Sequence, residues 1–257
     1  LIARLVNEGQ DVILVSSGAV ASGLSVLGFL KKPKALAELQ AAAAAGQNIL
    51  MQAYTSIFAR HGMKCAQILI TVEDFNDRER YLNTSHTINT LLKFGVVPVI
   101  NENDTVSVEG IKFGDNDTLS ARVAAAVEAD GLLILTDIDG LYASYDPKTK
   151  RCGSLLKRVD KITPEIRKVA SGTDKEGCVG GMSTKIAAAH IATSAGGPVI
   201  LANAFKDDLV IDIHPASDRD HDGTLFTVAQ MVGGKKHWIA FEADVRGRIL
   251  VDAGEKI

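Results

Sequence analysis

The chain has 257 residues, of which 46% are hydrophobic and 23% are charged, so it can bury a substantial core. That length suits one large domain, or one domain followed by part of another. The ordinary apolar fraction and the lack of a short repeat exclude collagen, a coiled coil and wholesale disorder. The net charge of −3 lacks the basic excess of a dedicated nucleic-acid-binding protein.

Cysteine and histidine usage indicates the compartment and argues against a metal centre. Cys65, Cys152 and Cys178 are odd in number and widely spaced, which argues against a disulfide framework and favours a reducing, cytoplasmic location. The six histidines show no zinc-ligand spacing, so no metal-ligating residues are predicted. No run of 18 apolar residues occurs, so no membrane-spanning helix is expected.

Short apolar stretches of strand length alternate with longer helical stretches. The first six residues have the spacing of a helix already under way, and we expect a further N-terminal strand to precede them. Unbroken apolar strands are typical of a parallel sheet covered by helices on both faces, so a doubly wound α/β domain is predicted. The predicted strands are residues 12–16, 67–71, 96–101, 132–136 and 198–202, and the predicted helices are residues 35–60, 76–92, 117–129 and 183–194.

The composition changes near residue 216, where a polar loop, SDRDHDG, begins. Strand-like pieces follow at residues 238–241 and 248–251. We interpret residues 1–230 as one domain and residues 231–257 as a linker or the start of a second domain. A terminal hairpin on the main domain explains the pattern equally well.

In an open α/β sheet, ligands bind where strands end and helices begin. The common nucleotide and hydrolase motifs are absent from the chain, so a ligand site is expected among the polar residues at the strand ends. Ser16, Ser17 and Gly18 follow the first predicted strand and could present several hydrogen-bond donors to an anion. An ordinary helix cap is the alternative.

Two dense polar clusters follow the strand at residues 96–101, namely NENDT at 101–105 and KFGDNDT at 112–118. Turn formation explains part of this density, and Asp117 is a suitable helix cap. Turns do not require so many Asn and Asp residues beside a lysine, however. The pattern favours a site for a ligand that carries both an ammonium and carboxylates.

Two later segments suit a nucleotide. Thr136 and Asp137 end a predicted strand and could hold a nucleotide, or a metal through water, or could cap the next turn. Gly180 and Gly181 precede a helix whose first turn carries Lys185. Adjacent glycines, a helix N-terminus and a lysine together suit a polyphosphate, although a flexible loop with an ordinary cap is the alternative.

Seven motifs, taken in order, resemble the glutamate 5-kinase branch of the amino-acid kinase family. Each is modest alone, but the ordered set covers residues 1–226 and is specific. They are SSGAVASG, AAAGQ, ILIT followed by EDFNDRERYLN, PVINENDTV, KFGDNDTLSARVA, LLILTDIDGLY and GGMSTKIAAA.

The resemblance implies a three-layer α/β/α sandwich around a mainly parallel sheet. It implies transfer of the γ-phosphoryl group of ATP, with Mg²⁺, to the γ-carboxylate of L-glutamate, which is the first step of proline biosynthesis. Self-association and feedback inhibition by proline are also expected, without a membrane or nucleic-acid partner. Residues 237–257 resemble a linker into a C-terminal PUA-like domain.

The resemblance also assigns roles to residues of this chain. Lys185 would neutralise charge on the transferring phosphoryl group, and Asp117 would hold lysines in place. The residues expected to contact glutamate are Ser17, Gly18, Asp104, Asn116, Asp115 and Lys112. The residues expected to contact ATP are Thr136, Asp137, Val179, Gly180, Gly181, Met182, Ser183, Thr184 and Lys185.

Two departures from the family pattern keep other functions open. The family's first strand ends in a Lys-x-Gly-Ser/Thr motif that this chain lacks, and Val179 stands where the phosphate loop has a threonine. One alternative is a sibling kinase that phosphorylates another carboxylate. The other is a module that binds a nucleotide or an amino acid without turnover.

Overall fold

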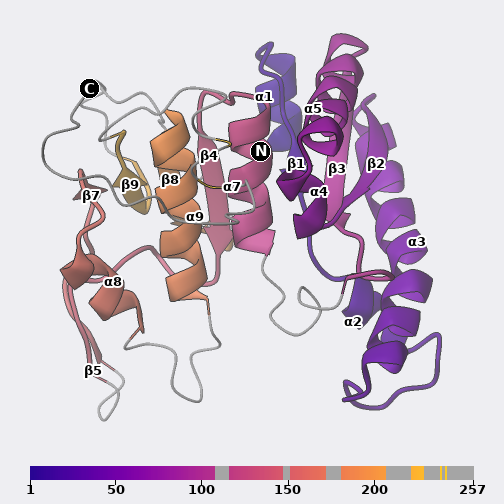
Figure 1. Cartoon of the computed structure of the whole chain (residues 1–257), viewed down its shortest axis with the longest axis horizontal. Helices are drawn as coiled ribbons and strands as arrows, with labels where there is room; N and C mark the ends of the chain where they lie inside the picture. The colour runs from indigo at the N-terminus through magenta and orange to yellow at the C-terminus, as the bar shows by residue number, and fades with distance from the viewer. Residues whose placement is uncertain are drawn as a thin grey trace, which may run out of the picture.

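The computed structural model describes residues 1–107, 116–146, 151–171, 181–206 and 221–228, with Trp238 and Phe241. Helices and strands alternate along the chain, and the strands lie between layers of helices (Figure 1). The predicted α/β class is confirmed. In the described part of the chain, no helix is long and apolar enough to cross a membrane.

Three parallel strands form the first sheet in the order β1 (Leu14–Val15), β3 (Val96–Glu102) and β2 (Lys64–Ile70). The predicted strand at residues 96–101 matches β3 closely, whereas β2 begins three residues before its predicted start. All three strands end at the same edge of the sheet because they are parallel. The residues that follow β1 and β3 are therefore brought together.

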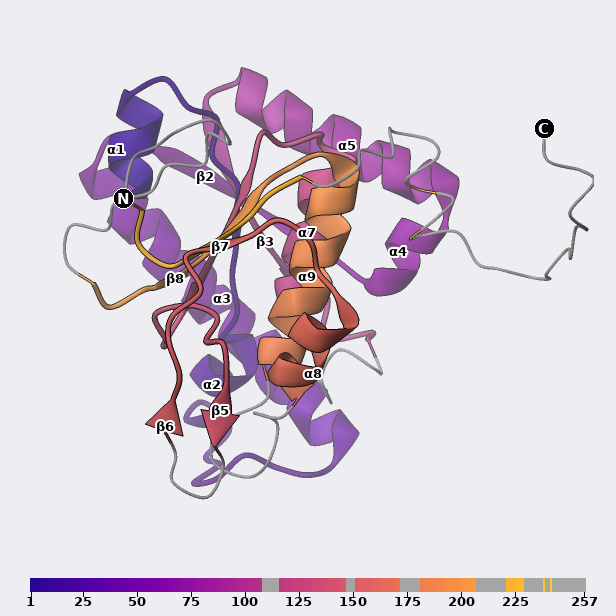
Figure 2. The same ribbon diagram turned by 90° about the vertical axis from the view of Figure 1, so that its left-hand side faces the viewer.

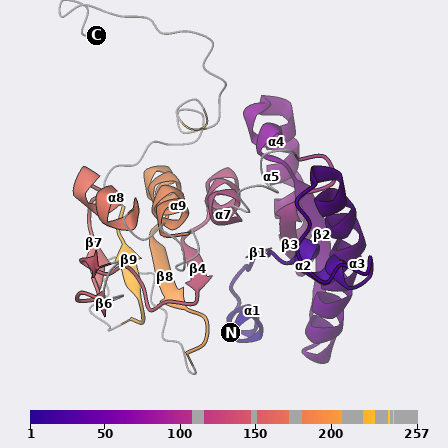
Figure 3. The same cartoon turned by 90° about the horizontal axis from the view of Figure 1, so that it is seen from below.

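Helices cover both faces of this first sheet (Figure 3). The helices α1 (Ile2–Asn7) and α3 (Leu36–Arg60) lie on one face, and α4 (Val72–Asn76), α5 (Arg78–Lys93) and α7 (Asn116–Ala126) lie on the other. Alternation along β3 explains how one strand serves both cores. Val97 and Val99 pack with Phe58 of α3, whereas Ile100 packs with the cluster that includes Ile88 of α5.

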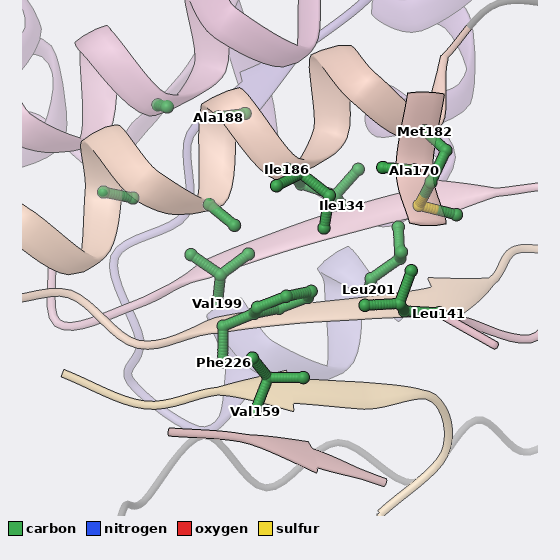
Figure 4. Packing of buried hydrophobic residues seen from close by; sticks show 13 residues of the cluster. Ile134, Leu141, Val159, Ala170, Met182, Ile186, Ala188, Val199, Leu201 and Phe226 are labelled. Carbon is green, nitrogen blue, oxygen red and sulfur yellow. The ribbon is translucent and has the colours of Figure 1, made fainter. Parts of the chain in front are cut away.

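Four strands form the second sheet in the order β4 (Leu132–Thr136), β8 (Val199–Asn203), β9 (Thr224–Phe226) and β7 (Arg158–Val159). The β4–β8 and β7–β9 pairs are parallel, and β8–β9 is antiparallel. The helices α8 (Pro164–Ser171) and α9 (Met182–Ala195) pack against this sheet. A separate two-stranded pair is formed by β5 (Tyr145–Asp146) and β6 (Arg151–Cys152). Figure 4 shows Ile186 of α9 above Val199 and Phe226 of the sheet.

The sequence did not predict the division of the strands into two sheets. Among the described residues, β1 is hydrogen-bonded to β3 and β4 to β8, and no strand pair joins the two groups. Helix α7 connects them instead, because it contacts β1 and β3 as well as β4. Figures 1 and 2 show α7 beside α9, so α7 lies between the two halves of the molecule.

The described residues near the C-terminus pack on both halves. The Trp238 indole N–H donates to the Phe75 carbonyl oxygen at 2.9 Å, and Phe241 makes an edge-on ring contact with His190 of α9. Both Trp238 and Phe241 are helical, so the strand predicted at residues 238–241 is wrong at these two positions. The domain boundary predicted near residue 230 lies outside the described residues.

Helix α2 (Ala19–Leu24) packs closely on α3 through two glycines. A Cβ atom added at Gly46 would lie 1.9 Å from the Ala19 carbonyl oxygen, and one added at Gly23 would lie 1.8 Å from the Ala42 carbonyl oxygen. No side chain could be accommodated at either distance without moving backbone. The two glycines therefore determine how close α2 lies to α3.

We expect Gly46→Ala to lower the free energy of unfolding by at least about 2 kcal/mol, because the added methyl group forces the two helices apart. Urea unfolding of the variant measures this loss as a lower midpoint. The matched control is Asn48→Ala, on an exposed position of the same helix, which should leave the midpoint nearly unchanged. Equal midpoints for Gly46→Ala and the wild type would contradict the close helix contact.

Candidate functional site

A cavity of about 260 Å³ opens where β1 and β3 end, and we call it the β1–β3 cavity. Its lining comes from the loop after β1, the helix α2, the α2–α3 connection, the end of β3 and the start of α7. The lining residues are Ser17, Gly18, Ala19, Val20, Ala21, Leu24, Lys32, Asn101, Glu102, Asp104 and Asn116.

Asn116, at the start of α7, joins the ends of the two strands. Its Nδ2 atom lies 2.7 Å from the Ser16 carbonyl oxygen, 2.6 Å from Ser17 Oγ and 2.9 Å from Asn101 Oδ1. Val15 of β1 is paired with Ile100 of β3, so residues after both strands start from neighbouring positions. Parallel pairing and the α7 N-terminus thus hold Ser17 and Asn116 together, as the sequence predicted.

Three side-chain amides beside the cavity form a series of hydrogen bonds. Asn101 Nδ2 donates to Gln47 Oε1 at 3.0 Å, and Gln47 Nε2 donates to Gln67 Oε1 at 3.1 Å. These contacts fix the side chain of Asn101, whose own oxygen accepts from Asn116. Gln47 ends the AAAGQ motif, but no role for it could be predicted from the sequence.

Two carboxylates and one lysine supply the charge of the β1–β3 cavity. Glu102 is buried, and its Oε1 atom accepts a hydrogen bond of 2.6 Å from Ser107 Oγ. Burial, together with the nearby Glu102 carboxylate, raises the pKa of Asp104 to about 6, although the Lys32 ammonium opposes both effects. Glu102 lies in the predicted NENDT cluster but was given no role of its own, and Lys32 was not predicted because it lies in an LKKPK stretch outside the motifs.

A second polar group forms where α7 meets α9. Lys185 Nζ lies 2.9 Å from Asp117 Oδ2, and the Thr184 hydroxyl donates to the same oxygen at 2.9 Å. Both members of the ion pair are largely shielded, with 16% of the Lys185 side chain and 23% of the Asp117 side chain exposed. The structure thus places Asp117 where it can orient Lys185, and Asp117 directly follows Asn116 of the cavity.

The remaining predicted residues stand apart from the β1–β3 cavity or outside the described chain. Thr136 and Asp137 follow each other at the end of β4, where the Thr136 hydroxyl donates to Asp137 Oδ1 at 3.1 Å. They do not line the cavity, and neither do the residues that open α9, namely Gly181, Met182, Ser183, Thr184 and Lys185. Lys112, Asp115, Val179 and Gly180 lie outside the described residues.

The described residues contain no cluster of three or more His, Cys, Asp or Glu that could hold a metal ion. Magnesium in phosphoryl-transfer sites commonly keeps several waters and is held by one or two carboxylates together with substrate phosphates. Asp137, which is exposed at the end of β4, suits that role better than Asp117, whose Oδ2 atom already accepts from Lys185.

A comparison with known protein families decides the membership of this chain. The sequence profile described as the amino acid kinase family matches residues 1–203. The chain belongs to the amino acid kinase family. The family match includes both the β1–β3 cavity and the Asp117–Lys185 pair.

Curated family members resemble the chain along nearly its whole length. A protein named glutamate 5-kinase from Thermoanaerobacter sp. (strain X514) is 45% identical over 253 residues, which cover 98% of this chain and 67% of that protein. Glutamate 5-kinases from Streptococcus sanguinis and Moorella thermoacetica are 46% and 47% identical, covering 98% and 97% of this chain. The chain spans about two thirds of these relatives, with 68% and 65% covered in the last two.

A solved structure shows a similar fold. The crystal structure of the T. acidophilum isopentenyl phosphate kinase product complex matches 84% of this chain at a TM-score of 0.50. The match covers 83% of that chain at 19% sequence identity. At that identity, the likeness supports the fold and says nothing about the substrate.

Proposed function

We propose that this chain transfers the γ-phosphoryl group of ATP to the γ-carboxylate of L-glutamate, which forms glutamyl 5-phosphate for proline biosynthesis. The single observation that carries the proposal is the adjacency of Asn116 and Asp117 at the start of α7. The first residue contacts Ser17 in the β1–β3 cavity, and the second holds Lys185 on α9. One helix end therefore connects a site suited to an amino acid with a site suited to phosphate.

The β1–β3 cavity has the groups that an amino acid requires. Asp104 and the buried Glu102 supply negative charge for an ammonium group. Ser17 and Asn116 supply a hydroxyl and an amide for a carboxylate, at the side of the cavity that adjoins α7. We infer that the γ-carboxylate of glutamate lies on this side and the ammonium group lies near Asp104.

The start of α9 supplies the groups that a polyphosphate requires. Its 14 residues begin after Gly181, so the backbone N–H groups of its first turn are available to phosphate oxygens. Lys185 adds a full positive charge one turn into the helix. We assign this end of α9, together with Thr136 and Asp137, to ATP.

The proposed reaction needs positioning and positive charge more than a proton acceptor. A carboxylate oxygen of glutamate attacks the γ-phosphorus, the bond to the β,γ-bridging oxygen breaks, and ADP leaves. The nucleophile is already ionised at neutral pH, so no general base is required. Lys185 would stabilise charge on the phosphoryl oxygens in the transition state. Mg²⁺ bound with ATP would neutralise further phosphate charge.

An assay of ADP release with a panel of substrates tests the proposal. Full-length protein with ATP and Mg²⁺ should release ADP on addition of L-glutamate, but not of L-aspartate or N-acetyl-L-glutamate. The acetylated substrate lacks the ammonium that Asp104 and Glu102 favour. Turnover with one of the other substrates would identify a sibling kinase, and nucleotide binding without any turnover would identify a binding module.

Further properties are proposed from the resemblance rather than from the geometry. We propose that the protein self-associates, is inhibited by proline and acts in the cytoplasm. Light scattering on full-length protein tests the first property, and ADP release with added L-proline tests the second. The location is consistent with Cys65 and Cys152, which are both free thiols.

Substrate affinity should depend on pH through Asp104. Its raised pKa of about 6 means that the carboxyl takes up a proton as the pH falls through 6, which removes the charge that an ammonium group needs. We expect the KM for L-glutamate to rise as the pH is lowered from 7 to 5. Initial rates measured across this range would show the increase.

Asp104→Asn provides the matched comparison for this pH effect. Loss of the carboxylate should raise the KM for glutamate at least about 10-fold at pH 7.5, since hydrogen bonds to charged groups contribute about 1.5–3 kcal/mol. The remaining pH dependence of KM below pH 7 should be weak. A variant that keeps the wild-type pH profile would show that another group titrates.

A further inference from the structure

We propose that Lys32 binds the α-carboxylate of the amino-acid substrate and so makes a free α-carboxylate a requirement for good substrates. The proposal rests on the glutamate site proposed above and adds to it a residue from a different part of the chain. Lys32 belongs to the connection between α2 and α3, which the sequence motifs do not include.

The position of Lys32 distinguishes it from its lysine neighbours. Lys31, Lys32 and Lys34 are all exposed, but only Lys32 of the three lines the β1–β3 cavity. Among the described residues that line the cavity, Lys32 is the one with a positive charge. The α2–α3 connection therefore brings a single ammonium group to the cavity.

The charges of the cavity match those of an amino-acid zwitterion. In an α-amino acid, the ammonium and the carboxylate are attached to the same carbon atom. Asp104 and Lys32 both line the cavity, and they lie close enough for the Lys32 ammonium to lower the pKa of Asp104. A negative and a positive side chain that line one cavity can pair with the ammonium and the α-carboxylate together.

The orientation inferred for glutamate in the cavity makes Lys32 the partner of the α-carboxylate. The γ-carboxylate must approach the phosphoryl group, and hence the α7 and α9 ends where Asp117 holds Lys185. Asp104 and Glu102 would repel a second carboxylate placed beside them. Lys32 supplies the attraction that offsets this repulsion, so the α-carboxylate lies beside Lys32.

Lys32→Met in full-length protein is the primary test. Methionine keeps most of the length of the side chain and removes its charge. We expect the KM for L-glutamate to rise about 10-fold or more, by the loss of a charge-assisted contact, with kcat and the KM for ATP within twofold of wild type. Lys32→Arg should recover most of the affinity. Lys31→Met and Lys34→Met are the matched controls and should behave as wild type.

A substrate lacking the α-carboxylate charge gives a second readout. L-Glutamic acid α-amide keeps the ammonium and the γ-carboxylate. The wild type should prefer glutamate over this amide, and Lys32→Met should lose most of that preference. A general loss of structure would lower kcat/KM for both substrates equally and leave the preference intact, which would overturn the assignment.

The outcomes separate this inference from the proposed function. Wild-type protein that does not phosphorylate L-glutamate would refute the proposed function itself. Wild-type activity with an unchanged glutamate KM and substrate preference in Lys32→Met would refute the role of Lys32 and leave the kinase assignment standing.

Discussion

Lys185→Met is expected to lower kcat by about 10³-fold, the upper end of the loss seen when a single stabilising group is removed from a transition state. The reason is that Lys185 is placed by Asp117 at the start of α9, where charge on the transferring phosphoryl group would develop. The KM for glutamate should change little, because Lys185 does not line the β1–β3 cavity. Steady-state ADP release with saturating substrates measures both parameters.

The control for this prediction is Lys161→Met, which removes an exposed lysine of the same half of the molecule. Its kcat should equal that of the wild type, and thermal unfolding should show both variants folded. If Lys185→Met kept its kcat and only raised a KM, Lys185 would be a binding residue without a role in the transition state.

Asp117→Asn is expected to lower kcat by about 10²-fold, through the loss of the group that positions Lys185. The asparagine keeps the size of the side chain but removes the charge that faces the lysine Nζ at 2.9 Å. The Thr184 hydroxyl would still find an oxygen acceptor, since it also lies 2.9 Å from the Gly181 carbonyl oxygen. The expected defect is therefore in the orientation of Lys185.

A double-mutant cycle distinguishes positioning from a general structural role. If Asp117 acts through Lys185, the variant with both Asp117→Asn and Lys185→Met should be no slower than Lys185→Met alone. Multiplication of the two losses would show that Asp117 acts independently of the lysine. Urea unfolding of all three variants would identify any loss of stability.

Much of the fold could be predicted because the buried strands are continuous apolar runs. The strand at residues 132–136 was predicted at its observed bounds, and β3 and β8 were predicted to within one residue at each end. β1 was predicted as five residues but has only two, because a strand's length depends on its neighbour and here β1 is paired with β3 alone among the described strands. The strand propensity of a segment carries no information about which strands it pairs with.

The candidate site was predictable to the extent that its residues follow strands. The segments that contain Ser17, Asp104 and Asn116 were found from their positions at strand ends, and the family resemblance singled out these three residues. The structure places all three around one cavity. Lys32 was missed because a connection between helices has no periodicity, and only the packing of α2 on α3 brings it to the cavity. The burial that raises the pKa of Asp104 is likewise a property of the folded chain.

The most direct test is to trap the product of the proposed reaction. An acyl phosphate reacts with hydroxylamine to give a hydroxamate, which mass spectrometry identifies. Full-length protein with ATP, Mg²⁺, L-glutamate and hydroxylamine should produce γ-glutamyl hydroxamate in proportion to ADP, and omission of ATP or glutamate should abolish it. Release of ADP without any hydroxamate would contradict the account, because it would show that the γ-phosphoryl group goes to an acceptor other than the carboxylate.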